Sequence, residues 1–239
     1  MAGPKVLVLG GTGTAGICLL RELAFRQRST VVYARNISKI PSDLVSNKFL
    51  EIIEGEMNDR ETLSNAIAKC STIISLLGPK INDRIESPTL FANIYKQNIF
   101  PLMRKHNIRR ILAMGTLSIQ RPEDSWTFFQ PMVVFFVRLM ASSVYNNIIN
   151  VAATFEHDAT DLDWTVFRIA QIPGDSDEGS WKNDREEDGG EPFVGWIGEK
   201  GWTTSVKRAV LTRWLADAAD SKADAWVGKM PAISHHGSK

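Results

Sequence analysis

Three glycines spaced three residues apart, Gly10, Gly13 and Gly16, lie between an apolar run that begins at Lys5 and a helical pattern over Ile17–Gln27. In such a strand–loop–helix unit, the first glycine permits a tight turn and the second lets the backbone approach a pyrophosphate. The third lets the helix pack closely on the strand. The phosphates then meet free amides and the positive end of the helix dipole. We therefore expect a dinucleotide site, and a purely structural glycine turn is the alternative. The loop residues expected to contact the cofactor are Gly10, Thr12, Gly13, Thr14, Ala15 and Gly16.

Arg35 follows a β-branched run, Thr30–Ala34, at the position where an NAD-specific site normally carries Asp or Glu to bind the ribose hydroxyls. A guanidinium there can hold the 2′-phosphate of NADP through charge-assisted hydrogen bonds, each worth about 1.5–3 kcal/mol. Lys39 adds positive charge nearby. The sequence thus favours NADP(H) over NAD(H), and the alternative is that Arg35 is a solvated loop residue.

The elements that must position these residues alternate along the chain between apolar runs and helical patterns. The runs that predict strands are Lys5–Gly10, Thr30–Ala34, Phe49–Ile53, Thr72–Leu77, Ile108–Met114 and Trp164–Ile169. The helical patterns are Ile17–Gln27, Asp59–Lys69 with Asp59 as N-cap, and Ser87–His106 with a kink or break at Pro101. This alternation predicts an α/β fold with a doubly wound parallel sheet of the Rossmann type. We expect one domain over residues 1–239, in which 170–239 supply the substrate-side loop and the terminal helix.

Two regions interrupt this alternation. Trp126–Phe155 is a long, largely apolar helical stretch, which either packs in the core or forms a substrate lid or homodimer face. Asp175–Glu191 is rich in Gly, Asp, Glu and Ser and is expected to be a mobile loop on the ligand side of the sheet. Trp202–Ala219 is expected to be the final helix, and Trp226–Lys229 an edge strand.

The bulk composition excludes several classes of protein. A net charge of +1 provides no field that would attract nucleic acid or an acidic membrane. The most apolar stretch, Pro131–Ala141, contains Arg138 and is too short to span a bilayer. The chain enters a strand by Lys5, which leaves no room for a signal peptide, so we expect a cytoplasmic protein.

The cysteines and histidines, which can carry chemistry, are expected to have structural or surface roles. Cys18 and Cys70 have no metal-type spacing and are expected to be buried free thiols. His106 and His157 fall near helix ends and are assigned capping or surface roles, while His235 and His236 are expected in a frayed tail. No metal-binding pattern is present.

Several segments, together with the glycine loop, resemble atypical short-chain dehydrogenase/reductases, in particular small fungal members of the NmrA-like and biliverdin-reductase-B-like NAD(P)-binding group. The segments that carry this resemblance are 55–59, 75–79, 163–168, 172–174, 194–198 and 226–231. The resemblance implies that Glu56 and Met57 lie near the adenine. It implies that Leu77, Gly78 and Pro79 form the loop under the nicotinamide ribose. Ile172 and Pro173 would form the turn beside the nicotinamide.

The sequence departs from this family in its catalytic residues. Ordinary members use a Tyr-x-x-x-Lys pair in which the lysine lowers the tyrosine pKa. Here Ile37, Ile99 and Ile149 stand four residues after the three tyrosines. Tyr145 lies on the expected helix and can still donate a proton. Thr116 and Ser118, after the fifth strand, are further candidates to orient a substrate carbonyl, unless they only satisfy backbone groups there.

Three functions are compatible with these residues. The first is an NADPH-dependent reductase of a small, largely apolar or aromatic carbonyl or quinone-type substrate. Its proton would come from Tyr145, Thr116, Ser118 or solvent. The second is a non-catalytic NADP(H) redox sensor, as the NmrA-like resemblance and the absent catalytic pair imply. The third is an isomerase, cyclase or ring-opening enzyme, because relatives serve fungal aromatic polyketide pathways in secondary metabolism.

Overall fold

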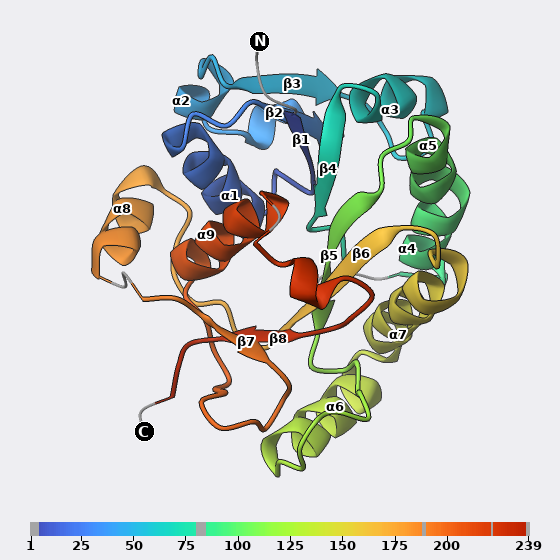
Figure 1. The fold of residues 1–239 in the computed structure, drawn as a ribbon, viewed down its shortest axis with the longest axis vertical. Coiled ribbons are helices and arrows are strands. Elements are labelled where there is room, and N and C mark those ends of the chain that lie inside the picture. Colours follow the sequence, from blue (N-terminus) through green and yellow to red (C-terminus); the bar gives the residue numbers. More distant parts are fainter. Residues whose placement is uncertain (1–4, 80–84, 188–189, 221, 238–239) are drawn as a thin grey trace.

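The computed structural model describes residues 5–79, 85–187, 190–220 and 222–237. Within them, eight strands form one sheet in the order β3-β2-β1-β4-β5-β6-β8-β7 (Figure 1). All neighbouring strands are parallel except β7 and β8, which pair antiparallel. The first six positions have the strand order of Rossmann folds, which confirms the doubly wound fold class predicted from the sequence. The strands are β1 Lys5–Leu9, β2 Thr30–Ala34, β3 Leu50–Glu54, β4 Cys70–Ser75, β5 Arg110–Thr116, β6 Asp163–Ile169, β7 Phe193–Gly195 and β8 Ala232–Ser234.

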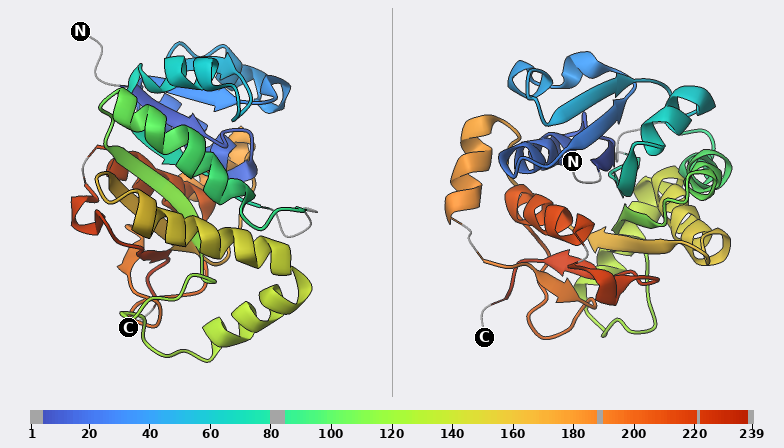
Figure 2. Two further views of the ribbon diagram at one scale, coloured as in Figure 1. Left: turned by 90° about the vertical axis from the view of Figure 1, so that its right-hand side faces the viewer. Right: turned by 45° about the horizontal axis from the view of Figure 1, so that its top comes forward.

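Helices cover both faces of the sheet, as the three views in Figures 1 and 2 show. Helices α1 and α9 pack together on one face, and α3, α5 and α7 lie on the other. The helices are α1 Thr14–Phe25, α2 Ser42–Val45, α3 Arg60–Ile67, α4 Leu90–Asn93, α5 Phe100–Lys105, α6 Phe129–Met140, α7 Ser142–Asp158, α8 Glu178–Glu187 and α9 Arg208–Ala219. Shorter helical segments are η1 Ile37–Lys39, the π-helical η2 Ile94–Ile99 and η3 Asp224–Trp226.

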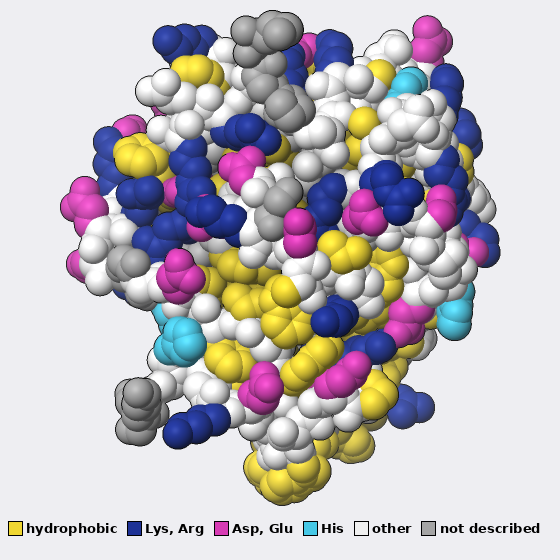
Figure 3. All heavy atoms as spheres, viewed as in Figure 1, with side chains coloured by type: hydrophobic (Ala, Val, Ile, Leu, Met, Phe, Trp, Pro, Cys, Tyr) yellow, Lys and Arg dark blue, Asp and Glu magenta, His cyan; other side chains and the backbone are white. Residues whose placement is uncertain are grey.

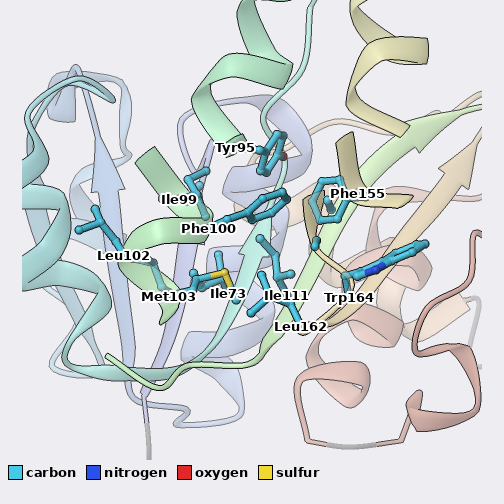
Figure 4. Packing of buried hydrophobic residues seen from close by; sticks show 14 of the residues in the cluster. Ile73, Tyr95, Ile99, Phe100, Leu102, Met103, Ile111, Phe155, Leu162 and Trp164 are labelled. Carbon is cyan, nitrogen blue, oxygen red and sulfur yellow. The ribbon is translucent and has the colours of Figure 1, made fainter. Parts of the chain in front are cut away.

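The alternation of side chains along the central strands divides the core into two layers. In β1, Leu7 and Leu9 face the α3–α5–α7 side, whereas Val6 and Val8 face the α1–α9 side, and all four are fully buried. Aromatic rings fill the first layer, where Tyr95, Phe100, Phe155 and Trp164 pack edge to face or tilted, with centroids 4.9–5.9 Å apart (Figure 4). Such continuous apolar strands are what a sheet covered on both faces requires.

The irregularity expected at Pro101 is confirmed. The π-helical turn η2 lies immediately before α5, in whose first turn Pro101 stands. Proline lacks an amide donor and clashes with the preceding turn, so the wider π-helical turn accommodates it. The same turn buries Tyr95, whose hydroxyl pairs with the Ser75 hydroxyl at 2.6 Å.

The expected single helix over Trp126–Phe155 is wrong, because the chain forms two helices, α6 and α7, bent by 118° about Ala141. Tertiary contacts fix each helix separately. Gln130 donates to the Leu117 carbonyl and holds α6 beside β5. Asn147 donates to the Ser87 carbonyl and holds α7 against the segment that precedes α4. The core interpretation holds for α7, which buries Val151 and Phe155, while α6 buries only Gln130.

The expected mobile loop over Asp175–Glu191 is also wrong in part, because α8 occupies Glu178–Glu187. Its polar composition gives the exposed face, while its one buried residue, Trp181, packs against Cys18 and Ala209. The Asp177 carboxylate accepts a hydrogen bond from the Ser180 amide and caps the helix. Residues 188 and 189 of this expectation lie outside the described residues.

Three further expectations in the C-terminal part need correction. The final helix begins at Arg208 rather than at Trp202. Trp226–Lys229 is no edge strand, because it leaves a 3₁₀ turn and contributes only a bridge between Lys229 and Thr165. The edge strand in this part of the sheet is β7, which pairs with β8. His235 is not frayed either, because its Nε2 accepts a hydrogen bond from the Lys207 amide at 2.9 Å.

One buried ion pair joins the segments around the C-terminal strands. Arg168 of β6 is fully buried and donates to both carboxylate oxygens of Asp124, at 2.6 and 2.7 Å. It also donates to the carbonyls of Ile119 and Met230. Asp124 in turn accepts from the amide of Ile197. This pair therefore ties the loop after β5, the approach to β8 and the turn after β7 to β6.

Candidate active site

The glycine loop leaves β1 at the sheet position where the strand order reverses, between β1 and β4. Gly10 has a φ of +79°, and a Cβ there would lie 2.9 Å from the Leu76 carbonyl carbon and oxygen. A Cβ on Gly16 would lie 2.4 Å from the Gly10 oxygen, so only glycine lets α1 start so close to the loop. Clefts at such reversal points are where open α/β sheets bind ligands.

The first turn of α1 is free to bind an anion. Its N-cap, Gly13, provides no side-chain cap, and no acidic residue lies in the first turn. Amides at this end point toward the loop with the positive end of the helix dipole. Thr14 is exposed, and Thr12 and Ala15 are half-buried. These features fit a dinucleotide pyrophosphate.

Strand pairing brings the predicted adenine-side residues to the same edge. Because Leu9 pairs with Tyr33 and Ala34 pairs with Glu54, Arg35 lies beside both the glycine loop and Gly55. Arg35 is exposed, and it makes no hydrogen bond or ion pair to the described residues. Glu56 is exposed at the same edge, and its carbonyl accepts a 2.8 Å hydrogen bond from the Tyr33 hydroxyl.

Other residues at this edge are structural. Met57 packs against the core, and its carbonyl accepts a hydrogen bond from Asn98. Glycine fits at position 55 because a Cβ there would lie 2.3 Å from the hydroxyl oxygen of the buried Tyr33 side chain. The Asn36 side chain accepts from the Ser38 amide and fixes the chain direction just after Arg35.

The predicted nicotinamide-side residues follow β4 and β6. Leu77, Gly78 and Pro79 are half-buried, and a Cβ on Gly78 would lie 3.4 Å from the Met114 methyl group. Met114 and Ile172 pack against the same core layer as Ala15 of the glycine loop. Pro173 accepts a hydrogen bond at its carbonyl from the Arg208 amide. Met114 was not predicted as a site residue, although it stands at the carboxyl end of the predicted fifth strand.

The three proton-donor candidates are not brought into one cluster. The Thr116 hydroxyl accepts from the Ser118 amide at 3.2 Å and so closes the turn after β5. Ser118 is 5% exposed at the same turn. Tyr145 lies in the first turn of α7, with the Arg138 guanidinium 6.0 Å from its ring centre. No hydrogen bond joins Tyr145 to Thr116 or Ser118 among the residues that the structure describes.

The segment after Pro173 crosses the outer side of α1. The Cys18 thiol donates to the Asp175 carbonyl, and Arg21 Nε donates to the Ser176 carbonyl at 3.0 Å. Burial raises the pKa of Cys18 to about 11, so the thiol stays protonated and is no nucleophile. Arg208, at the start of α9, lies near this thiol, and its buried Nε has no hydrogen-bond partner among the described residues. The sequence analysis gave no signal for Arg21 or Arg208, because both depend on this long-range crossing.

A family model described as NAD(P)H-binding matches residues 10–222, from the glycine loop to just beyond α9. The chain belongs to the NAD(P)H-binding family. This membership confirms that the cofactor is a nicotinamide dinucleotide, the class that includes NADP(H), and it agrees with the resemblance to atypical short-chain dehydrogenase/reductases.

Solved structures share the fold of this NAD(P)H-binding protein at low identity. A short-chain dehydrogenase/reductase from Veillonella parvula DSM 2008, in complex with NADP, superposes with a TM-score of 0.71 at 15% identity, over 98% of this chain and 95% of that chain. An anaerobillin reductase from Escherichia coli O157:H7 gives 0.69 at 14% identity, over 98% of each chain. A putative epimerase from Bacteroides thetaiotaomicron gives 0.68 at 16% identity, over 99% of each chain. Likeness at these identities shows the fold alone.

Two further properties of this NAD(P)H-binding protein concern metals and membranes. Across the described ranges, no group of three or more His, Cys, Asp or Glu side chains could hold a metal ion. In the same part of the chain, no single helix is long and apolar enough to cross a membrane. Helices α6 and α7 meet the length and composition criteria only when they are taken together across their 118° bend.

Proposed function

We propose that this chain is an NADPH-dependent reductase of a small, largely apolar or aromatic carbonyl or quinone-type substrate. The observation that carries the cofactor preference is Arg35, exposed and without a partner among the described residues, beside the glycine loop. An NAD-type ribose would need an acceptor at this place, whereas a 2′-phosphate needs a cation. The neighbour from Veillonella parvula that was crystallised with NADP supports this choice.

The residues of the chain would act chiefly by position. The uncapped amides of Thr14, Ala15 and Gly16 would bind the pyrophosphate, and Arg35 the 2′-phosphate. Met114 and Ile172, with the 77–79 segment, would hold the nicotinamide ring against an apolar floor that excludes water. When bound, the reduced nicotinamide supplies the hydride.

The substrate side would be built by residues 170–239 together with the turn after β5. The Thr116 hydroxyl stands at the carboxyl end of β5, and because it only accepts from the Ser118 amide it would keep its own proton to orient a carbonyl. The buried Ser118 hydroxyl would be the second candidate. Tyr145 or solvent would then supply the proton. The anaerobillin reductase among the structural neighbours supports a reductase on this architecture.

The test is calorimetric titration of the wild type and of Arg35→Ala with NADPH and NADH. If Arg35 binds the 2′-phosphate, the substitution weakens NADPH binding roughly 10–100-fold, or about 1.4–2.8 kcal/mol, and leaves NADH nearly unchanged. Lys48→Ala is the matched control, because it removes an exposed cation just before β3, at the other end of the strands. Equal losses for both cofactors would refute the assignment of Arg35.

Turnover then separates the reductase from its alternatives. Consumption of NADPH with quinones or aromatic ketones supports the reductase. Tight binding without turnover, and with a large difference between NADP⁺ and NADPH, supports the redox sensor instead. If no dinucleotide binds, the proposal fails and a non-redox reaction on the same fold becomes the leading function.

We also propose that a second copy of this chain covers α6. The segment between Asp124 and Glu156 carries one charged residue, Arg138. It therefore lacks the charges that would bind a charged partner, whereas its uncharged surface can pack against the same surface of a second copy. Hydrophobic side chains gather over α6, at the bottom of Figure 3. The exposed ones are Trp126, Phe128, Met132, Phe135, Phe136, Leu139 and Met140. Monomers rarely expose so many large apolar side chains together.

Light scattering tests this association. The wild type is expected to be a dimer, and Phe136→Glu is expected to shift it to a monomer. Val45→Glu, a change at an isolated exposed apolar residue, serves as the control and leaves the dimer intact. A monomeric wild type overturns the dimer. A change in KM of Phe136→Glu would then favour the lid interpretation.

A further inference from the structure

Arg208 is the first residue of α9, and its guanidinium has no anionic partner. Its backbone amide donates to the Pro173 carbonyl at 3.2 Å, which fixes the start of the helix beside the turn that follows β6. Its Nε is buried without a hydrogen-bond partner among the described residues. Its Nη1 and Nη2 make no hydrogen bond or ion pair with those residues either, but they are not buried. The two terminal nitrogens of Arg208 are therefore open to a ligand.

The packing of α9 against α1 places Arg208 beside the glycine loop. The two helices lie side by side (Figure 1). Arg26 pairs with Asp217 at 2.7 Å near their carboxyl ends, and Cys18 packs against Ala209 near their amino ends, so the helices run in the same direction. The offset along the chain is 191 positions in both pairs. Arg208 is therefore level with the first turn of α1.

The Arg208 side chain extends toward the predicted nicotinamide-side turn. Side chains of a helix lean toward its amino end, which for α9 is the edge of the sheet that carries the glycine loop. Its Nη1 lies 4.0 Å from the position that a Cβ on Gly174 would occupy, and the guanidinium lies near the Cys18 thiol. The charge is thus held between the first turns of α1 and the residues that follow Pro173.

The carboxylates around this guanidinium have other partners. Asp184 lies beside the same turn, and it pairs with Lys207 at 3.1 Å. Asp177 accepts a 2.9 Å hydrogen bond from the Ser180 amide and caps α8. Arg208 therefore keeps a positive charge without an ion-pair partner in the described part of the chain, next to a helix end that is itself free to bind an anion.

We propose that Arg208 binds the pyrophosphate of the nicotinamide dinucleotide from the side of α9. The amides of the first turn of α1 would bind the same group from the loop side. A guanidinium suits this role because two of its N–H groups can donate to phosphate oxygens together. Arg35 lies at the end of β2, where the adenosine half is expected, whereas Arg208 lies beside the nicotinamide-side turn. The pyrophosphate joins these two halves of the cofactor.

The pyrophosphate is common to NADPH and NADH, so Arg208 should strengthen both and should not select between them. This inference rests on the cofactor site of the proposed function, but not on turnover or on the role of Arg35. If no carbonyl or quinone is reduced, the reductase fails while the assignment of Arg208 is still decided by binding measurements.

Calorimetric titration of the wild type and of Arg208→Gln with NADPH, NADH and adenosine 2′-monophosphate tests the proposal. The substitution is expected to weaken NADPH and NADH by the same factor, at least about tenfold, equivalent to about 1.4 kcal/mol. Binding of adenosine 2′-monophosphate, which has no pyrophosphate, is expected to stay unchanged. Arg35→Ala should give a different pattern, in which NADPH and adenosine 2′-monophosphate weaken and NADH does not. The two assignments can therefore fail separately.

Two further variants separate charge from packing. Arg109→Gln is the matched control, because it removes an exposed arginine that pairs with Asp163 at the amino end of β5, and it should bind all three ligands as the wild type does. Arg208→Lys keeps the positive charge and is expected to lose less affinity than Arg208→Gln. Urea unfolding should show nearly wild-type stability for Arg208→Gln, because its side chain makes no hydrogen bond that would be lost.

Three results would overturn the assignment of Arg208. The first is wild-type affinity of Arg208→Gln for both dinucleotides. The second is a loss for NADPH alone, which would assign Arg208 to the 2′-phosphate. The third is a folded Arg208→Lys protein that loses as much affinity for both dinucleotides as Arg208→Gln, because the charge would then play no part; this comparison decides the question if Arg208→Gln is unstable.

Discussion

Alanine substitutions at two glycines of the same loop should have different consequences. In Gly16→Ala the new Cβ would start 2.4 Å from the Gly10 oxygen and 2.7 Å from the Gly11 backbone, whereas real Cβ atoms stay at least 3.0 Å away. The backbone of α1 or of the loop must therefore move by more than half an ångström, since 3.0 − 2.4 = 0.6 Å. Overpacking of this kind costs about 1–3 kcal/mol of folding free energy.

Gly13→Ala introduces the same methyl group without this clash. Its Cβ would lie 3.6 Å from the Gly10 oxygen, which is an ordinary contact, and the φ of −78° and ψ of 163° suit alanine. We expect its free energy of unfolding to stay within about 1 kcal/mol of the wild type, because the loss of a glycine N-cap and the lower entropy of the unfolded chain act in opposite directions.

The two variants should nevertheless both lose cofactor affinity. In Gly16→Ala the amides of the first turn move, and the loss of one charge-assisted hydrogen bond of about 1.5–3 kcal/mol weakens NADPH roughly 10–100-fold. In Gly13→Ala the methyl group stands where the pyrophosphate approaches the backbone, so binding weakens at least about tenfold in a protein of nearly normal stability. Urea unfolding and calorimetry measure the two quantities. Wild-type affinity in Gly13→Ala would refute the placement of the pyrophosphate, and wild-type stability in Gly16→Ala would refute the packing argument.

Further predictions concern stability. Arg168→Met leaves the Asp124 carboxylate buried without its partner, so the free energy of unfolding measured in urea should fall by about 3–5 kcal/mol. The double variant Arg168→Met/Asp124→Leu should recover part of this loss, and no recovery would contradict the ion-pair explanation. Burial raises the pKa of Cys18 to about 11 and of Cys70 to about 12, from ordinary values near 9. Because thiols of the unfolded chain ionise at lower pH than the buried ones, the stability that these groups contribute is complete below pH 9 and is lost as the pH rises to 11–12. Over this pH range the urea midpoint should fall less in Cys18→Ala/Cys70→Ala than in the wild type. An identical fall in both proteins would exclude the thiols as the cause. Asp59→Ala removes the N-cap of α3 and should cost about 1 kcal/mol, which thermal unfolding can measure against an unchanged value expected for Asn58→Ala.

The cofactor half of the fold was predictable because its signals are local. The runs that form β1 and β2 are continuous and apolar, and the N-cap of α3, Asp59, precedes its helix directly. The alternation of strands with helices predicts a doubly wound sheet, and the observed pairing of β1 with β2 places Arg35 beside the glycine loop.

The C-terminal half was harder to predict because its elements depend on distant partners. Helix α8 has the composition of a loop, and it is anchored by Trp181 against α1 and α9. The bend at Ala141 has neither proline nor glycine, and follows from where Gln130 and Asn147 find their carbonyl partners. The hydrogen bond from Arg110 to the Asp163 carbonyl likewise forms only when β5 and β6 pair, because the two residues are more than fifty positions apart in the sequence.

The ion pair of Arg168 and Asp124 has a consequence for how this chain can evolve. It anchors the ends of the segments that carry α6, the turn after β7 and the approach to β8, which belong to the β6–β8–β7 half of the sheet rather than to the β1–β2–β3 half. Insertions or substitutions between these anchors would change the shape of the proposed substrate side while their ends stay fixed to β6. New specificities can therefore be acquired by exchanging these segments, whether by natural drift or by loop grafting, without rebuilding the half of the molecule that binds the dinucleotide.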